Sequence, residues 1–221
     1  MAELISHWKF DNDYVDDPGT NDLTEGGTGN SFSTSVKRVG THSLQLNGSG
    51  YGKDTSISGL PTGNADMSFG GWVYIADPTS SSQVLISGGT LIAGQCVSIY
   101  SSSATTIHVD SFSVGWDLSF TVSTISPNTW YWWWVQYTAS TKTFELFINN
   151  VSQGGQALPG NLNLTFGSIE IGGFFELDNL RLTGNIDDVR WYSGVTSEAE
   201  RNAIYFEGFI FRVGSMLQMI K

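Results

Sequence analysis

Cysteine is nearly absent from this sequence, whose only copy is Cys96. One cysteine excludes an intrachain disulfide and a cysteine-rich metal site. Cys96 lies within the apolar run Gln95–Tyr100, so we expect a buried structural thiol. A 221-residue chain is long enough for a β domain that its own core stabilises without such cross-links.

Positive charge is also scarce. Lys and Arg number 10 against 21 Asp and Glu, which gives a net charge of −11 and a pI near 4.4. Nucleic-acid binding needs a basic surface that displaces counterions, and an anionic membrane would repel this chain. We therefore expect neither nucleic acid nor a membrane surface as partner.

Long apolar runs are missing as well. No stretch approaches the roughly 18 residues of a transmembrane helix, so we expect no membrane insertion. The opening Met1–Ile5 enters a first strand without the charged and apolar regions of a signal peptide. The sequence thus predicts a protein without an export signal.

Glycine and aromatic residues are abundant, with 26 Gly and 8 Trp. Short segments of alternating polarity recur, separated by turn signals such as Asn47-Gly48 and Asp77-Pro78. These segments are 4–10, 43–46, 67–75, 84–87, 107–114, 118–122, 130–137, 143–148, 168–171 and 186–192. Many short strands at this spacing predict a single all-β sandwich domain.

One helix is expected near the end of the chain. Ser197 and Glu200 fit a capping box, with a helix that runs towards Phe206 and stops near Gly208. We accordingly divide the chain into a domain of residues 1–206 and an apolar C-terminal extension of residues 207–221.

Several motifs occur in a familiar order. The segments His42–Tyr51, Ser68–Tyr74 and Gly184–Tyr192, followed by Ser197–Glu200, resemble those of laminin-G-like domains in the concanavalin A-like lectin/glucanase superfamily. The resemblance covers roughly residues 4–206. It implies an all-β, two-sheet antiparallel jelly-roll sandwich with one short C-terminal helix, but it does not imply one function.

Catalysis is disfavoured. Glucanases of this superfamily carry a Glu-x-Asp-x-x-Glu pattern, since retaining hydrolysis needs an acid and a nucleophile about 5 Å apart. The nearest match here is Glu176 and Asp178 followed by Arg181, so the last carboxylate is missing. We expect no enzyme, and a glycoside hydrolase is the disfavoured alternative.

A structural calcium ion is implied by the resemblance. In relatives it can lie between the N-terminal loop and the closing strand, and calcium favours several oxygen ligands. The candidate ligands here are Asp11, Asp16, Asp22 and Asp187. The alternative is a set of aspartate-rich turns without an ion.

An aromatic face is expected opposite the main core. Alternation within 130–137 directs Trp133, Val135 and Tyr137 to the core. The opposite face would carry Trp72, Tyr74, Trp132, Trp134 and Phe147. These rings could stack on sugars, or a loop such as 101–117 could cover them as a second small core; the sequence leaves both open.

The C-terminal extension is so apolar that we expect it to be buried against other residues rather than exposed to water. Its candidate assembly residues are Phe209, Phe211, Val213, Met216 and Leu217. They could pair with the chain's own sandwich as an edge strand or dock on a neighbouring subunit.

Together these features favour a non-catalytic binding or assembly module. Laminin-G-like sandwiches usually act outside cells, yet we expect no export signal. A phage virion surface protein, made in the host cytoplasm, reconciles the two: a capsid decoration, head fibre or tail adhesin. Its expected partners are other virion subunits in an oligomer and a cell-surface glycan. The alternative is a free, extracellular carbohydrate-binding lectin or adhesin module.

Overall fold

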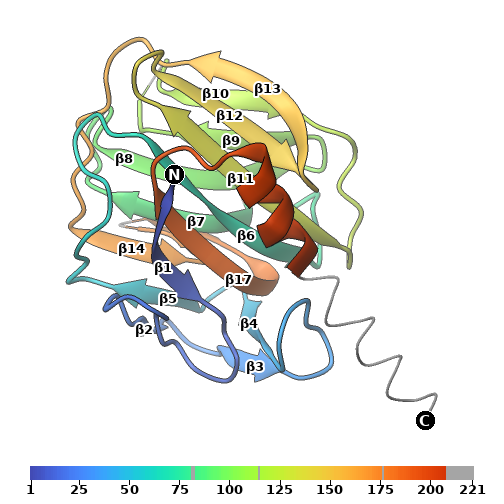
Figure 1. Ribbon diagram of the computed structural model, residues 1–221. Coiled ribbons are helices and arrows are strands. Elements are labelled where there is room, and N and C mark those ends of the chain that lie inside the picture. Colours follow the sequence, from blue (N-terminus) through green and yellow to red (C-terminus); the bar gives the residue numbers. More distant parts are fainter. Residues whose placement is uncertain (81–82, 114, 176, 208–221) are drawn as a thin grey trace.

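Two antiparallel β-sheets pack face to face and enclose the main core, as Figure 1 shows for the computed structural model. The structure describes residues 1–80, 83–113, 115–175 and 177–207, with only the backbone described at 177–179. The expected two-sheet antiparallel jelly-roll sandwich is confirmed.

Sheet A is the larger of the two sheets. Its path is β13-β12-β11-β6-β17-β4-β3, and β1 also pairs with β17. The bounds are β1 Glu3–Trp8, β3 Ser31–Ser33, β4 Ser43–Asn47, β6 Met67–Ile75, β11 Trp130–Thr138, β12 Thr143–Ile148, β13 Val151–Ala157 and β17 Thr183–Ser193. Strands from both ends of the chain therefore meet at the centre of this sheet.

Sheet B follows the order β10-β9-β8-β7-β14-β5-β2. Its bounds are β2 Thr24–Gly26, β5 Tyr51–Asp54, β7 Gln83–Gly89, β8 Cys96–Ser103, β9 Thr106–Asp110, β10 Asp117–Thr121 and β14 Ser168–Ile171. A separate two-stranded ribbon joins β15 Gly173–Phe174 to β16 Leu177–Arg181.

The core between the sheets follows the alternation of the strands. Trp133, Val135 and Tyr137 of β11 are buried there, as expected. The ring of Phe69 on β6 stacks on that of Trp191 on β17, with centroids 4.3 Å apart. Each large buried side chain contributes about 1.5–3 kcal/mol through its removal from water.

Some strands were not expected from the sequence. Strand β13 was missed because its residues are small or polar and largely exposed, so no alternating apolar pattern marks it. It occupies the edge of sheet A, where pairing with β12 supplies its backbone hydrogen bonds. Such edge strands form because a neighbour offers a ladder, which local sequence does not reveal.

The expected helix is present at residues 198–207. The backbone N–H of Ser197 donates to Glu200 Oε2 at 2.7 Å, and that of Glu200 donates to Ser197 Oγ at 3.3 Å. This capping box begins the helix where the sequence predicted. The helix lies across the outer face of sheet A (Figure 1) and extends one residue past the expected boundary at 206.

Among the described residues, no helix is long and apolar enough to cross a membrane.

Candidate ligand-binding groove

The outer face of sheet A carries the expected aromatic residues, and the C-terminal helix covers most of them. Trp72, Trp132, Trp134 and Phe147 are buried in a second apolar cluster, together with Ile204 of the helix. Their predicted direction, away from the main core, is confirmed. The C-terminal helix, and not the expected loop 101–117, covers these rings.

Specific contacts hold the helix on these rings. Tyr205 stacks on Trp72 with centroids 5.4 Å apart, and the guanidinium of Arg201 lies 4.0 Å from the centroid of Phe147. At the sheet surface, Trp134 Nε1 donates to Thr196 Oγ1 at 3.1 Å. Four of the five expected ligand-binding rings are thus internal packing in this structure and offer no surface to a sugar.

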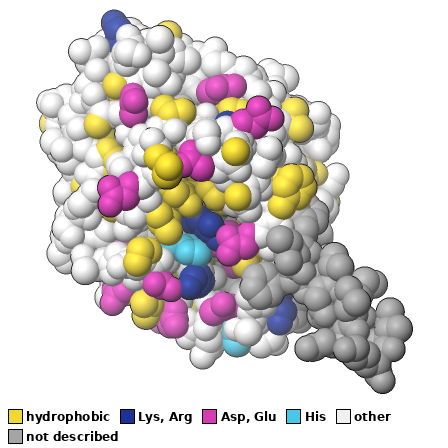
Figure 2. All heavy atoms as spheres, viewed as in Figure 1, with side chains coloured by type: hydrophobic (Ala, Val, Ile, Leu, Met, Phe, Trp, Pro, Cys, Tyr) yellow, Lys and Arg dark blue, Asp and Glu magenta, His cyan; other side chains and the backbone are white. Residues whose placement is uncertain are grey.

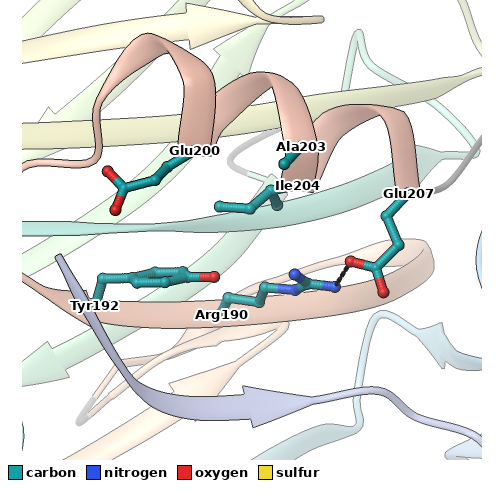
Figure 3. A pocket seen from close by; sticks show the side chains of 6 residues that line it. All are labelled: Arg190, Tyr192, Glu200, Ala203, Ile204 and Glu207. Atoms are coloured by element: carbon teal, nitrogen blue, oxygen red, sulfur yellow. Dashed lines mark hydrogen bonds and ion pairs between the residues drawn. The ribbon is translucent and has the colours of Figure 1, made fainter. Parts of the chain in front are cut away.

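A shallow pocket of about 370 Å³ remains along the seam between the helix and β17. Figure 3 shows Arg190 and Tyr192 of β17 beneath Ala203, Ile204 and Glu207 of the helix. Arg190 Nη2 donates to Glu207 Oε2 at 2.6 Å and ties the end of the helix to the sheet. The mainly apolar pocket is part of the helix docking.

Tyr74 differs from the other four rings because it lies beyond the helix and is partly exposed. The cross-strand register places it in a row that crosses four strands. Gln45 of β4 pairs with Asn185 of β17, Asn185 pairs with Tyr74 of β6, and Tyr74 pairs with Trp130 of β11. The rings of Tyr74 and Trp130 lie 5.4 Å apart and are tilted by 55°.

Three members of this row, Gln45, Asn185 and Tyr74, line a groove of about 540 Å³, which we name the Tyr74 groove. Its lining residues are Gly29, Ser31, Val36, Gln45, Leu46, Asn47, Tyr74, Ala76, Asn128, Thr183, Gly184 and Asn185. The volume is in the range of small-molecule sites, and a few placed polar groups on a partly aromatic surface are typical of them.

The groove offers both kinds of hydrogen-bonding group. Gln45 Oε1 accepts from Ser31 Oγ at 3.3 Å, and Asn185 Nδ2 donates to Ser43 Oγ at 3.0 Å. These contacts hold two amide side chains in the groove lining, of which Gln45 is exposed and Asn185, next to Tyr74 in register, is buried. The arrangement can bind a ligand with an apolar face and hydroxyl edges, because amides both donate and accept.

Sequence reasoning identified Tyr74 but missed Gln45, Asn128 and Asn185. Polar residues at exposed strand positions are common, so nothing local distinguished these. The alternation of Leu44, Leu46 and Ile186 towards the core could have placed Gln45 and Asn185 on the outer face. Asn185, 111 residues from Tyr74 along the chain, pairs with Tyr74, and Gln45, 29 residues from Tyr74, pairs with Asn185. The order of the strands in the sheet therefore brings these positions into one row.

Each of the expected calcium ligands accepts a backbone hydrogen bond in this structure. Asp11 Oδ1 accepts from the backbone N–H of His42, and Asp16 uses both oxygens to accept from the N–H groups of His7 and Asn21. Asp22 accepts from the N–H of Asp16 at 2.8 Å. Over the described part of the chain, no three carboxylate, His or Cys side chains gather as a metal site. These residues do not fit one calcium site.

Asp187 is the fourth expected ligand. Its Oδ2 accepts from the backbone N–H groups of Arg38 and Val39, at 2.7 and 2.9 Å. Burial raises the pKa of this carboxyl well above its usual range, against the lowering effect of these hydrogen bonds. Asp187 therefore holds the 38–39 loop against sheet A, and calcium binding stays a prediction.

The neighbouring Asp188 is paired with Arg190 and also contacts His7. Its Oδ1 lies 2.5 Å from His7 Nε2 and accepts from Arg190 Nη2 at 2.9 Å. Figure 2 shows basic, acidic and histidine side chains gathered next to an apolar band on this face. A pocket of about 210 Å³ borders Asp188 and Glu207. Such a buried ion cluster positions elements, and each partner depends on the others.

The incomplete glucanase pattern lies on and beside β16. Arg181, at the position of the last carboxylate, donates from Nη1 to Glu170 Oε2 at 2.9 Å, and its guanidinium lies 4.0 Å from the centroid of Tyr51. Glu176 and the expected assembly residues Phe209, Phe211, Val213, Met216 and Leu217 lie outside the described residues. Arg181 thus forms a buried ion pair at a position where hydrolysis would need an acid.

Several solved structures share this fold. Domain 4 of AbnA, a GH43 extracellular arabinanase from Geobacillus stearothermophilus, was solved in complex with arabinotriose. It matches with a TM-score of 0.73 at 16% identity, over 92% of this chain and 98% of that domain.

Botulinum neurotoxin domains match as well. The serotype G binding domain has a TM-score of 0.67 at 14% identity, over 92% of this chain and 51% of that chain. A structure of botulinum neurotoxin type C has a TM-score of 0.70 at 12% identity, over 93% of this chain and 51% of that chain. Cell entry of that toxin depends on interaction with two ganglioside molecules. This chain spans about half of these toxin domains, and identities this low show the fold alone.

No curated protein matches the chain significantly. A family model, in contrast, matches residues 46–200, from the end of β4 into the C-terminal helix. The chain belongs to the concanavalin A-like lectin/glucanases superfamily.

Proposed function

We propose that this protein is a non-catalytic carbohydrate-binding module that holds a glycan in the Tyr74 groove. The observation that carries the proposal is the groove lining, in which Gln45 and Asn185 follow the partly exposed Tyr74 ring in one cross-strand row. Sugars present apolar C–H faces that stack on rings and hydroxyls that bond to amides. The same-fold domain solved in complex with arabinotriose supports this class of ligand.

A non-catalytic role is supported by Arg181. The buried Arg181–Glu170 ion pair leaves no third acid at the end of the glucanase-like pattern. The Tyr74 groove itself has no carboxylate among its described lining residues. Because retaining and inverting hydrolysis both use a pair of carboxylic acids, this groove is suited to binding rather than cleavage.

A glycan array followed by calorimetry tests the proposal. We expect Tyr74→Ala to weaken binding of the best glycan by about tenfold or more, since a stacking contact contributes on the order of 1–2 kcal/mol. Phe112→Ala is the control, because Phe112 is an exposed ring outside the groove. Equal affinity of wild type and Tyr74→Ala for every bound glycan would contradict the proposed site.

The position of this module on a virion surface remains a proposal that the sequence alone supports. It rests on the resemblance to folds that usually act outside cells and on the apolar residues 209–217. Removal of residues 209–221 should leave a folded domain that no longer joins particles. Mass spectrometry of purified particles at stoichiometric copy number would support this role; absence from particles would favour the free lectin or adhesin.

A further inference from the structure

We infer, resting on the proposed function, that the Tyr74 groove selects uncharged glycans and discriminates against sialylated or uronate-containing ones. The first observation is the chemistry of the lining. None of its described residues is Asp, Glu, Lys, Arg or His, although the chain holds 10 basic and 21 acidic residues. Recognition in this groove therefore depends on an aromatic ring, amides and hydroxyls.

The amide groups match the hydroxyls of a neutral sugar. Gln45 Oε1 accepts from Ser31 Oγ, and the side chain of Gln45 is exposed. Its Nε2 hydrogens can therefore donate to a ligand. The side chain of Asn128 is exposed and makes no hydrogen bond within the described residues. Each amide can donate to one sugar oxygen and accept from another hydroxyl, so hydroxyl pairs can be bound without any ionic contact.

The nearest basic residues along the chain are directed elsewhere. Lys37 and Arg38 follow the lining residue Val36. Lys37 Nζ donates to the carbonyl oxygen of Thr41 at 2.8 Å, and the guanidinium of Arg38 lies 4.1 Å from the centroid of Trp72. Trp72 belongs to the cluster beneath the helix, so both cations are held by neighbours outside the groove lining.

A carboxylate ligand would consequently be bound at a disadvantage. It would lose hydration in the groove without a guanidinium or ammonium partner to compensate. The chain's net charge of −11 adds repulsion, which salt screens only beyond about 8 Å at physiological ionic strength. A neutral glycan avoids both penalties.

The test compares matched glycans on an array that carries each neutral oligosaccharide beside its sialylated or uronate form. We expect the neutral member of each pair to bind at least about tenfold more tightly, a difference of about 1.4 kcal/mol. We also expect the neutral affinity to change little between low and high salt, because no ionic contact is screened.

Gln45→Lys supplies the missing cation, and Gln45→Met is a control of similar size. We expect Gln45→Lys, and not Gln45→Met, to narrow the gap between neutral and acidic glycans. Tighter binding of acidic glycans by wild type, lost in Tyr74→Ala, would overturn the charge selectivity and leave the proposed function standing. Binding of no glycan at all would overturn both.

Discussion

The indole rings of Trp132 and Trp134 stack with centroids 4.9 Å apart and planes within 9° on the outer face of sheet A. Both are fully buried, because the C-terminal helix packs over them. Tyr74 lies on the same face, two positions after the covered Trp72 on β6, and is partly exposed. One sheet face is thus divided into a covered apolar half and an open groove with amide side chains.

This division predicts opposite effects for two aromatic substitutions. Trp134→Ala should lower the free energy of unfolding by about 3–5 kcal/mol, because it leaves a cavity beneath the helix. Tyr74→Ala should lower it by about 1 kcal/mol or less, since its ring is partly exposed. Urea unfolding of both variants measures the difference. Equal stability of Trp134→Ala and wild type would show that the helix does not cover this face.

Arg190 links Asp188 to the end of the helix, so its removal should be strongly destabilising. Arg190→Met removes the guanidinium that pairs with the buried Asp188 carboxylate and with Glu207. It should lower the free energy of unfolding by about 3–5 kcal/mol. The matched control is Lys9→Met, which breaks the exposed pair with Asp17 and should have little effect. Denaturant midpoints that fall equally in both variants would argue against a special role for Arg190.

Asp110 predicts a specific pH dependence. Burial raises its pKa from the usual 3.8 to about 6, although the N–H of Phe112 donates to it. The folded state therefore holds this proton more tightly than the unfolded state, and Asp110 lowers stability as pH rises from about 4 through 6. Asp110→Asn should remove that loss and stabilise the protein at pH 7 by at most about 3 kcal/mol.

Unfolding of wild type and Asp110→Asn across pH 4–8 measures this difference. The two curves should approach each other near pH 4, separate as pH rises to about 6, and stay apart by a constant amount above it. Comparison of the two proteins isolates Asp110, because other groups such as Asp187 titrate in both. Parallel curves over the whole range would show that Asp110 has an ordinary pKa.

Calcium provides a further measurement. Asp11, Asp16, Asp22 and Asp187 each accept backbone hydrogen bonds, and no three carboxylate, His or Cys side chains gather as a metal site in the described part of the chain. The sequence-based hypothesis of a calcium site predicts a Tm that rises with calcium concentration, because a ligand that binds only the folded state stabilises it. The same Tm in chelator and in millimolar calcium would contradict that hypothesis.

Much of the fold could be read from local patterns. Alternation in Met67–Ile75 and Thr143–Ile148 predicted those strands to the residue, and Ser197 with Glu200 predicted the start of the helix. Among the strands that were missed, β13, β15 and β16 form at an edge or in a separate ribbon, where pairing partners compensate for weak local patterns.

The sequence by itself determined which face each aromatic side chain takes. Trp132 and Trp134 point away from Trp133 because side chains alternate along a strand, whatever surrounds them. Only the tertiary structure decided which rings are covered, since the helix docks on Trp72 through Tyr205 and stops short of Tyr74. The groove has the same origin: Gln45 and Asn185 reach Tyr74 through strand pairing between distant segments, and no local pattern encodes that pairing.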